Sequence, residues 1–355
     1  MPTPRTWDLF CRVIDNHGDL GVAWRLSADL AARGERVRLW ADDAAALAWM
    51  APQGHAAVDL VAWTDPAPDL APGDVVVETF GCDPPANFVR RMGESDTPPV
   101  WINLEYLSAE AYVERNHGLP SPVEAQGRML TKHFFYPGFT HRTAGLLREP
   151  HLLTARQGFV RDDWLRELEL GAQSGERLVS LFCYDKAALA GMLDLLVSTP
   201  TLLLATPGAA ADQVRALLGP KLRRGALRAR LLPHLSQQGY DRLLWASDIN
   251  FVRGEDSFVR AQWAGSPFVW QIYPQHDGAH AIKLNAFLDR LLAGADDALA
   301  QPLRSAFLGW NMLAPLPAAL PATAPWRSLC EGWRDRLSEQ PDLTTQLLSF
   351  VEKTR

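Results

Sequence analysis

The sequence has few cysteines and no excess of positive charge, and both shortages narrow its possible functions. Four cysteines are scattered over 355 residues without CxxC spacing, which disfavours a zinc site or a disulfide framework and predicts buried thiols in a reduced protein. The formal net charge is −6, so no general basic field is present to hold nucleic acid. We therefore expect no nucleic acid partner.

Long apolar runs are also missing. No stretch approaches the roughly 18 consecutive apolar residues of a membrane span, and residues 1–10 lack an apolar run of signal-peptide length. The hydrophobic fraction of 47% and the charged fraction of 21% are ordinary for a globular enzyme. These features predict a cytoplasmic protein that contacts no membrane.

Several catalytic motifs are absent. Without a GxSxG elbow, a Walker A sequence or a CxxC pair, hydrolase, nucleotide-triphosphatase and redox functions lose their usual support. His276 and His280 are four residues apart, but no third or fourth ligand is evident, which disfavours a metal there. No DxD pair marks a metal-bound diphosphate either. We expect no metal and no cofactor.

Strand and helix signals alternate twice along the chain. In the first helix, which starts near Gly21, Val22, Leu26 and Leu30 are spaced four apart on one face. Residues 107–170 show weaker periodicity and separate the two alternating runs. Apolar runs predict strands at 7–14, 37–40, 58–63, 74–78 and 100–104, and again at 178–184, 201–205, 230–232, 249–252 and 268–271.

This repeated alternation is typical of two parallel-sheet domains, and the length exceeds what one hydrophobic core usually serves. We predict an α/β protein with two Rossmann-like domains facing a cleft. The first covers residues 1–170, the second covers residues 171–328, and a last helix over 329–355 packs back on the first. Ligands of such domains bind at the carboxyl ends of the strands, so residues that follow strands are the functional candidates.

Two carboxylates, Asp15 and Asp19, lie on the turn between the first strand and the first helix. Gly18 and Gly21 permit a tight turn and close approach by a ligand. This loop does not read GxGxxG, and two acids line a phosphate site poorly; they suit a general base or a clamp on a cationic or hydroxylated substrate. The structural alternative, in which Asp19 caps the helix and Asp15 satisfies the turn, is equally supported by the turn alone.

A second strand–turn–helix junction carries Arg253, Gly254, Glu255, Asp256 and Ser257. A helix N-terminus suits a diphosphate, Gly254 admits close approach, and Arg253 and Ser257 can contact the charge. Glu255 and Asp256 suit sugar hydroxyls or the acceptor. In the structural alternative Asp256 or Ser257 caps the helix and Glu255 pairs with Arg253, and the isolated motif favours that alternative.

Two segments carry a family resemblance: FCRVIDNHGDLGVAWRL, from Phe10, and LLWASDINFVRGEDSFVRAQWAGSPFVWQIYPQHDGAH, from Leu243. They resemble the EarP family of protein-arginine rhamnosyltransferases, and the resemblance covers nearly the whole chain. It implies a GT-B architecture, with an N-terminal domain for the protein acceptor and a C-terminal domain for dTDP-β-L-rhamnose. The implied reaction is metal-free, inverting rhamnosylation of one arginine in the N-terminal domain of elongation factor P, which supports translation through polyproline stalls.

The resemblance also implies residue roles. Asp19 is the implied general base, Asp15 its neighbour and Glu255 the third functional carboxylate. Gln237 and Tyr240 match thymine positions. The complete implied donor-binding set is Asn16, Gly18, Tyr184, Gln237, Tyr240, Arg253, Gly254, Asp256, Ser257 and Tyr273.

The sequence departs from the family pattern at three positions. His234 stands where phenylalanine is usual, Ser236 where proline is usual, and His17 replaces an aromatic residue. The first two departures concern the stacking of the base and leave the class of donor unchanged.

The implied chemistry agrees with the acidic turn. A guanidinium stays protonated at neutral pH because its pKa is far above that range, so carboxylates are needed to orient it and to remove a proton as the new bond forms. One alternative is a GT-B glycosyltransferase or sugar-nucleotide epimerase acting on a small molecule or lipid-linked sugar. Another is a nucleotide-sensing or scaffold protein that binds elongation factor P without modifying it.

Overall fold

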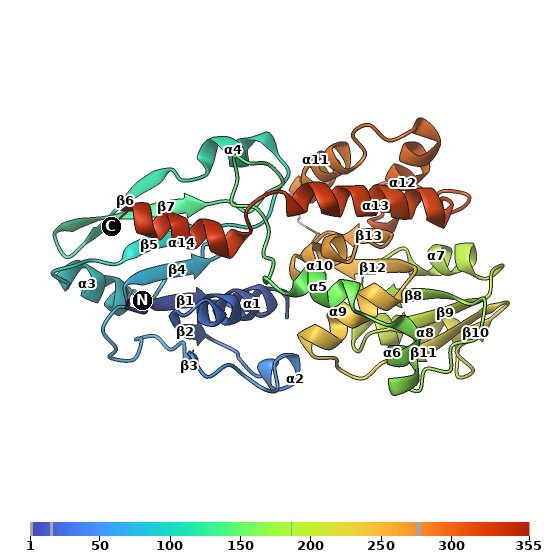
Figure 1. Ribbon diagram of the computed structural model, residues 1–355, viewed down its shortest axis with the longest axis horizontal. Helices are drawn as coiled ribbons and strands as arrows, with labels where there is room; N and C mark the ends of the chain where they lie inside the picture. Colours follow the sequence, from blue (N-terminus) through green and yellow to red (C-terminus); the bar gives the residue numbers. More distant parts are fainter. Residues whose placement is uncertain (1–2, 15–16, 186, 275–277, 355) are drawn as a thin grey trace. The chain divides into compact units, whose positions relative to one another are not determined.

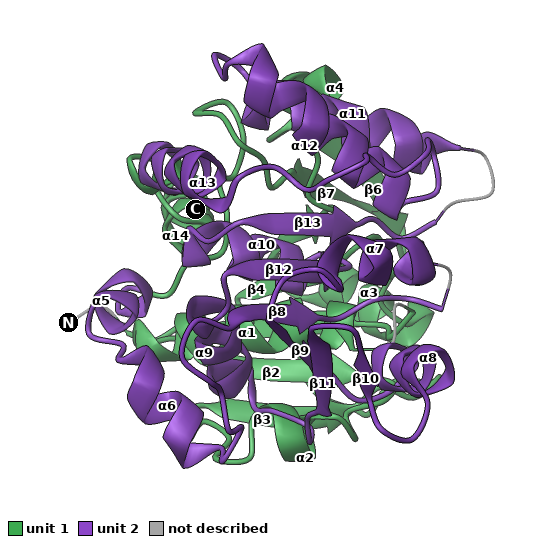
Figure 2. Cartoon of the chain, turned by 90° about the vertical axis from the view of Figure 1, so that its right-hand side faces the viewer, with its two compact units in different colours: residues 1–149, 337–355 green, residues 150–336 purple. Residues whose placement is uncertain are grey.

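The computed structural model describes residues 3–14, 17–185, 187–274 and 278–354, which form two compact α/β units (Figure 1). Unit 1 comprises residues 1–149 and 337–355, and unit 2 comprises residues 150–336 (Figure 2). Each unit is built on one mixed sheet that is mostly parallel.

Unit 1 contains a seven-stranded sheet in the order β3-β2-β1-β4-β5-β7-β6, in which only the β6–β7 pair is antiparallel. Because the strand order reverses between β1 and β4, the carboxyl ends of these two strands flank the usual ligand position of a doubly wound sheet. The strands are β1 (Thr6–Cys11), β2 (Arg36–Ala41), β3 (Val58–Ala62), β4 (Val75–Thr79), β5 (Val100–Leu104), β6 (Pro120–Ala125) and β7 (Arg128–Phe135); the helices are α1 (Gly18–Ala32), α2 (Leu47–Met50), α3 (Ala86–Glu94), α4 (Ala111–Asn116) and α14 (Leu343–Thr354).

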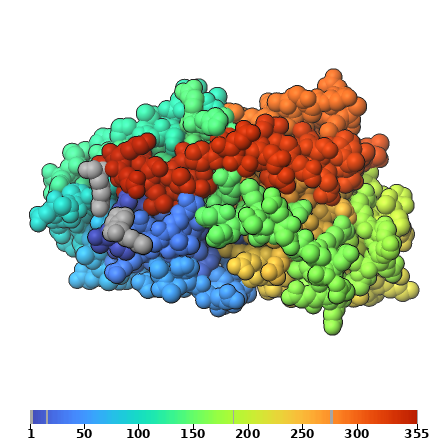
Figure 3. Space-filling view, in the orientation of Figure 1, coloured from blue at the N-terminus to red at the C-terminus, as the bar shows by residue number. Residues whose placement is uncertain are grey.

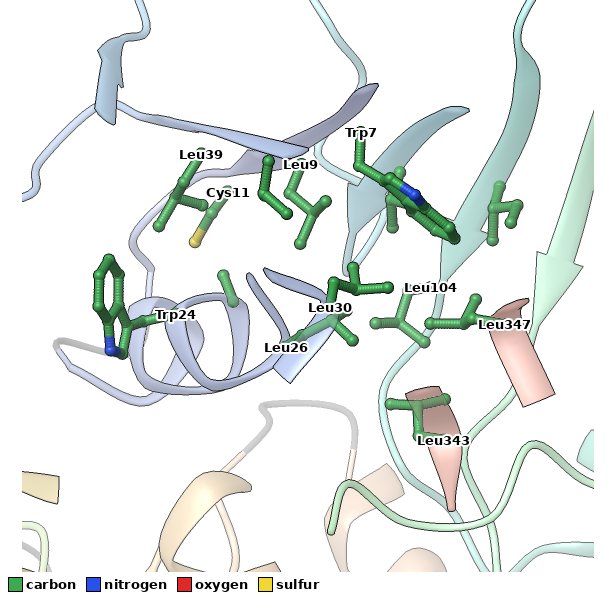
Figure 4. Close-up of a cluster of buried hydrophobic side chains, with 14 of the residues drawn as sticks. Trp7, Leu9, Cys11, Trp24, Leu26, Leu30, Leu39, Leu104, Leu343 and Leu347 are labelled. Carbon is green, nitrogen blue, oxygen red and sulfur yellow. The ribbon is translucent and has the colours of Figure 1, made fainter. Parts of the chain in front are cut away.

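One face of the unit 1 sheet is covered by helices from opposite ends of the chain. Leu26 and Leu30 of α1, on the face predicted from their spacing, are buried against β1, and Leu343 and Leu347 of α14 join the same core (Figure 4). In the space-filling view α14 lies at the surface of unit 1 (Figure 3). The C-terminal segment therefore completes the core that α1 begins.

Unit 2 repeats the topology with six strands in the order β10-β11-β9-β8-β12-β13, of which only β10–β11 is antiparallel. Its order reverses between β8 and β12, which defines a second expected ligand position. The strands are β8 (Arg177–Leu181), β9 (Thr201–Ala205), β10 (Arg223–Arg224), β11 (Leu227–Leu231), β12 (Ile249–Arg253) and β13 (Phe268–Gln271); the helices are α5 (Leu152–Gln157), α6 (Arg161–Glu167), α7 (Leu189–Leu196), α8 (Ala209–Leu218), α9 (Gln237–Ala246), α10 (Asp256–Ala264), α11 (Ala279–Leu291), α12 (Asp297–Trp310) and α13 (Thr323–Ser338).

The unit boundaries differ from the predicted domains 1–170 and 171–328. Trp164 and Leu165 of α6 pack with Leu178 of β8, so the segment that precedes the second sheet belongs to unit 2. The single C-terminal helix predicted over 329–355 is two helices, α13 and α14, of which only α14 lies wholly in unit 1.

Several other elements were not predicted, among them β6, β7 and α12. The edge strand β6 contains Pro120 and Pro122, and proline is rare in strands except at edges. Helix α12 contains Pro302 in its interior, which obscures a helical pattern. The first strand is also shorter than predicted and ends at Cys11.

The four cysteines are free thiols, as predicted, and three of them are buried. Burial raises the pKa of Cys183 to about 12, so this thiol stays protonated and inert near neutral pH. Among the residues described, every helix is too short or too polar to cross a bilayer.

Replacing Leu347 with alanine should destabilise unit 1 selectively. The change leaves a cavity beneath α14 and should cost about 2–5 kcal/mol of unfolding free energy. Hydrogen exchange should report lost amide protection in β1 and α1 with unchanged protection in β8 and β12. Lys353→Ala, at an exposed position of the same helix, is the control; equal loss of protection in both units would contradict the assignment of α14 to unit 1.

Candidate functional site

The predicted site residues follow strands at the reversal point of each sheet. In unit 1, Gly18 and Asp19 open α1, which follows β1; in unit 2 the predicted residues lie after β8 and β13, at the end of β12, or in the first turns of α9 and α10. Asp15 and Asn16 lie outside the described residues, so the structure gives no account of them.

Asp19 is a buried carboxylate in the first turn of α1, with 3% of its surface exposed. Its Oδ2 accepts a hydrogen bond of 2.9 Å from the backbone N–H of Ile14. The N-cap position belongs to His17, and Gly18 is the first helical residue, so Asp19 does not cap the helix. Burial, together with the charge of Asp19, raises the pKa of the Cys11 thiol, which places this carboxylate close to the end of β1.

An aromatic pair that the sequence did not reveal lies after β4 and β5. Phe80, whose φ of 61° is rare for a bulky residue, stacks on Tyr106 with 4.1 Å between ring centroids and 8° between ring planes. The buried Asn103 ties the two turns together: its Oδ1 accepts from the Gly81 N–H at 3.2 Å and its Nδ2 donates to Glu105 Oε1 at 2.9 Å. Phe80 and Tyr106 could have been found from their position in the sequence, because both lie in turns that follow predicted strands.

In unit 2, Arg253 lies against two aromatic rings. Its guanidinium carbon is 4.4 Å from the ring centroids of both Phe182 and Tyr184. Tyr184 also meets Tyr273 edge-on at 5.5 Å. The structure thus brings together three predicted residues from the ends of β12, β8 and β13. Phe182 was missed, although it lies two residues before Tyr184, on the same face of the predicted strand.

The turn over residues 253–257 is held by Ser257. The Ser257 hydroxyl accepts from the Arg253 N–H at 3.1 Å and donates to the Arg253 carbonyl oxygen. Gly254 adopts a left-handed conformation with a φ of 62°, which favours glycine. The N-cap position of α10 belongs to Glu255, which makes no cap hydrogen bond through its side chain. The predicted alternative of an Asp256 or Ser257 cap is therefore wrong.

The start of α9 reaches the same edge of the sheet. Ser236 caps this helix, since its Oγ accepts from the Gly239 N–H at 3.1 Å, and the buried Gln237 is the first helical residue. Tyr240 meets Phe182 edge-on at 5.8 Å, and burial raises the pKa of its phenol. The departure from the family pattern at Ser236 thus provides a helix cap.

A buried ion pair joins α9 to α10. The Arg260 guanidinium binds Asp241 in a bidentate manner, with Nε–Oδ1 and Nη2–Oδ2 distances of 2.8 and 2.7 Å. The two residues are 2% and 5% exposed. The pair fixes the two helices whose N-terminal ends carry Gln237 and residues 255–257.

Within the described ranges, no three or more His, Cys, Asp or Glu side chains are grouped as a metal site would require. His280 is described, whereas His276 is not. The expectation that no metal is needed stays a prediction.

Comparisons with known proteins agree over nearly the whole chain. The profile of the family described as Elongation-Factor P (EF-P) rhamnosyltransferase EarP matches residues 7–352. A protein-arginine rhamnosyltransferase of Pseudomonas aeruginosa is 43% identical over 372 residues, covering 97% of this chain and 98% of the relative. A solved structure on EarP-mediated arginine glycosylation of translation elongation factor EF-P is 33% identical, with a TM-score of 0.70, covering 99% of this chain and 100% of that chain.

More distant structures share the fold alone. The glycosyltransferase VinC, solved in complex with dTDP, is 14% identical with a TM-score of 0.54, covering 98% of each chain. The chain has two α/β units, each built on a mostly parallel sheet, and it is similar to solved glycosyltransferases. Together these features define a GT-B glycosyltransferase and confirm the predicted fold class. The chain belongs to the EarP family of protein-arginine rhamnosyltransferases and is therefore an enzyme.

Replacing Arg260 with alanine should be strongly destabilising, because it leaves the Asp241 carboxylate buried without its guanidinium. We expect a loss of about 3–5 kcal/mol, and a much smaller loss in the double variant Arg260→Met, Asp241→Leu. Urea unfolding measures both. As a control, Arg215→Ala breaks an exposed pair with Asp212 and should cost less than about 1 kcal/mol. Equal losses in the single and double variants would refute this account of the pair.

Proposed function

We propose that this enzyme transfers L-rhamnose from dTDP-β-L-rhamnose to one arginine in the N-terminal domain of elongation factor P, with inversion at the anomeric carbon. The rhamnosylated factor would relieve ribosomes stalled at polyproline, and we place the enzyme in the cytoplasm, where translation occurs. The observation that carries the proposal is Arg253, which lies against two aromatic rings beside the N-terminus of α10. Family membership supports an arginine acceptor and rhamnose as the transferred sugar.

The surroundings of Arg253 suit a diphosphate that leaves with negative charge. Phe182 and Tyr184 orient the guanidinium through their faces without neutralising its positive charge, which suits an anionic dTDP group. The backbone N–H groups at the start of α10 add donors and the positive end of the helix dipole. We assign Gly254 and Asp256 to the same donor site, and Ser257 to shaping the turn through its bonds to Arg253.

The nucleoside lies, in this proposal, against the aromatic residues that surround the end of β8. An amide side chain offers both a donor and an acceptor to thymine, which fits Gln237 at the start of α9. Tyr240 would contact the base, and Tyr273, which is 47% exposed, would contact the deoxyribose. Tyr184 would support the Tyr273 ring from its edge. Asn16 and Gly18 remain proposed donor contacts from unit 1.

Asp19 is the proposed general base. A guanidinium nitrogen would attack the anomeric carbon as the carbon–oxygen bond to dTDP breaks, and dTDP would leave with the bonding electron pair. One guanidinium proton would pass to the Asp19 carboxylate, so the product arginine keeps its positive charge. Asp15 and Glu255 would orient the acceptor and localise its charge. The Ile14 N–H holds the Asp19 carboxylate in place through Oδ2.

The stack of Phe80 on Tyr106 supports an arginine acceptor. A planar guanidinium binds aromatic faces, and carboxylates such as Glu105 add charge complementarity. Tyr106 is 37% exposed, and its turn follows β5. Strand β5 pairs with β4, and β4 pairs with β1. We propose that this pair helps to seat the acceptor arginine.

The reaction can be tested by intact mass spectrometry of elongation factor P after incubation with the enzyme and dTDP-β-L-rhamnose, with no metal added. We expect a gain of one deoxyhexose on a single arginine, and no gain when that arginine is replaced by lysine. If the enzyme binds dTDP but the mass does not change, the acceptor is a different molecule, as in the small-molecule alternative.

Asp19→Asn should reduce turnover by at least about a hundredfold, because the carboxamide cannot accept the proton. Binding of dTDP, measured by calorimetry, should change little. Asp59→Asn, at an exposed position of β3 in the same unit, should retain full turnover. Near-normal turnover of Asp19→Asn would remove Asp19 from the role of base.

A further inference from the structure

The carboxyl end of the edge strand β13 is held by an asparagine from outside the sheet. Asn311 follows α12, and its Oδ1 accepts from the Ile272 N–H at 3.0 Å. Its Nδ2 donates to the Trp270 carbonyl at 2.8 Å. The amide therefore binds the two backbone groups that a further strand would bind on this side of β13.

The other side of the same strand end holds the turn that starts α10. The indole Nε1 of Trp270 donates to the Gly254 carbonyl at 2.7 Å, and the Gly254 N–H donates to the Gln271 carbonyl at 3.3 Å. Both backbone polar groups of Gly254 are thus bound by β13. Since Gly254 lies between Arg253 and Glu255, the direction of both side chains depends on where β13 ends.

The same strand end also positions the turn after β8. The Gln271 side chain accepts from the Tyr184 N–H through Oε1 at 2.8 Å. Tyr184 provides one of the two rings against Arg253, and its edge partner Tyr273 comes directly after Ile272. The turn at Gly254, the Tyr184 ring and Tyr273, all in the proposed donor site, therefore depend on residues 270–272.

We propose that Asn311 is a positioning residue for the nucleotide-sugar site. By binding the Trp270 carbonyl and the Ile272 N–H, Asn311 fixes the end of β13, and β13 in turn fixes Gly254 and Tyr184. Asn311 lies far from these residues in the sequence and acts on them through β13. This inference rests on the proposed function, since it assumes that the site binds dTDP.

The test compares Asn311→Leu with Asn285→Leu. Asn285 is a partly buried amide of α11 that bonds the Ala281 carbonyl and Arg304, so its loss is a matched control within unit 2. For Asn311→Leu we expect the Kd for dTDP and the KM for dTDP-β-L-rhamnose to rise about tenfold, because the end of β13 no longer holds Gly254 and Tyr184 in place, with kcat nearly unchanged. Asn285→Leu should match the wild type in Kd and KM. The Gly254 and Tyr184 amide resonances should shift only in Asn311→Leu.

Each outcome decides between the two proposals. If the wild type fails to bind dTDP, the donor assignment falls and the inference falls with it. If the wild type binds dTDP and Asn311→Leu binds equally well, only the inference is wrong. If Asn311→Leu does not fold, Trp270→Phe replaces it: the indole N–H to Gly254 is lost while an aromatic ring remains against Phe258, which stacks on Trp270 at 3.9 Å. The same rise in Kd is expected, and an unchanged Kd overturns the inference.

Discussion

The alignment of α9 and α10 in unit 2 depends on one buried ion pair, Asp241 with Arg260. Removing two charges from water is costly, and the cost is offset only because both guanidinium–carboxylate bonds are short and paired. An apolar contact at this position would bring α9 and α10 together without defining their alignment. The bidentate pair permits one alignment, and the starts of both helices must be aligned because Tyr240 and the turn over residues 253–257 surround the same edge of the sheet.

The two units reverse their strand order in the same way but present side chains of opposite charge at the reversal. At its strand reversal, unit 1 presents the Asp19 carboxylate and, beside the aromatic stack, Glu105. At the equivalent point unit 2 presents Arg253 and a helix N-terminus. The proposed reaction joins a cationic nucleophile to a sugar whose leaving group is an anion. In this proposal the strand order sets where each ligand would bind, and the residues that follow the strands set which charge each unit would accept.

The sequence predicted which candidate residues lie at junctions between strands and helices. Asp19, Arg253 and Glu255 could be placed there because strand, turn and helix patterns are local. The α9 cap at Ser236 was not predicted, since family comparison marked the position only as a departure. Trp270 and Asn311 could not be found from the sequence, because their partners are backbone groups brought close only by folding. The boundary before α5 was misplaced for the same reason: the packing of Trp164 against β8 leaves no local pattern.

Helix α14 has a consequence for the order in which the protein acquires its structure during synthesis. Leu343, Leu347 and Val351 belong to the core of unit 1, yet the ribosome makes them after the whole of unit 2. Unit 2 is contiguous and can fold while the chain is still being extended, whereas unit 1 waits with an open core until the last segment emerges. Unit 1 is therefore synthesised first but completes its fold after unit 2. Until α14 is added, the apolar core of unit 1 stays exposed and could bind a chaperone.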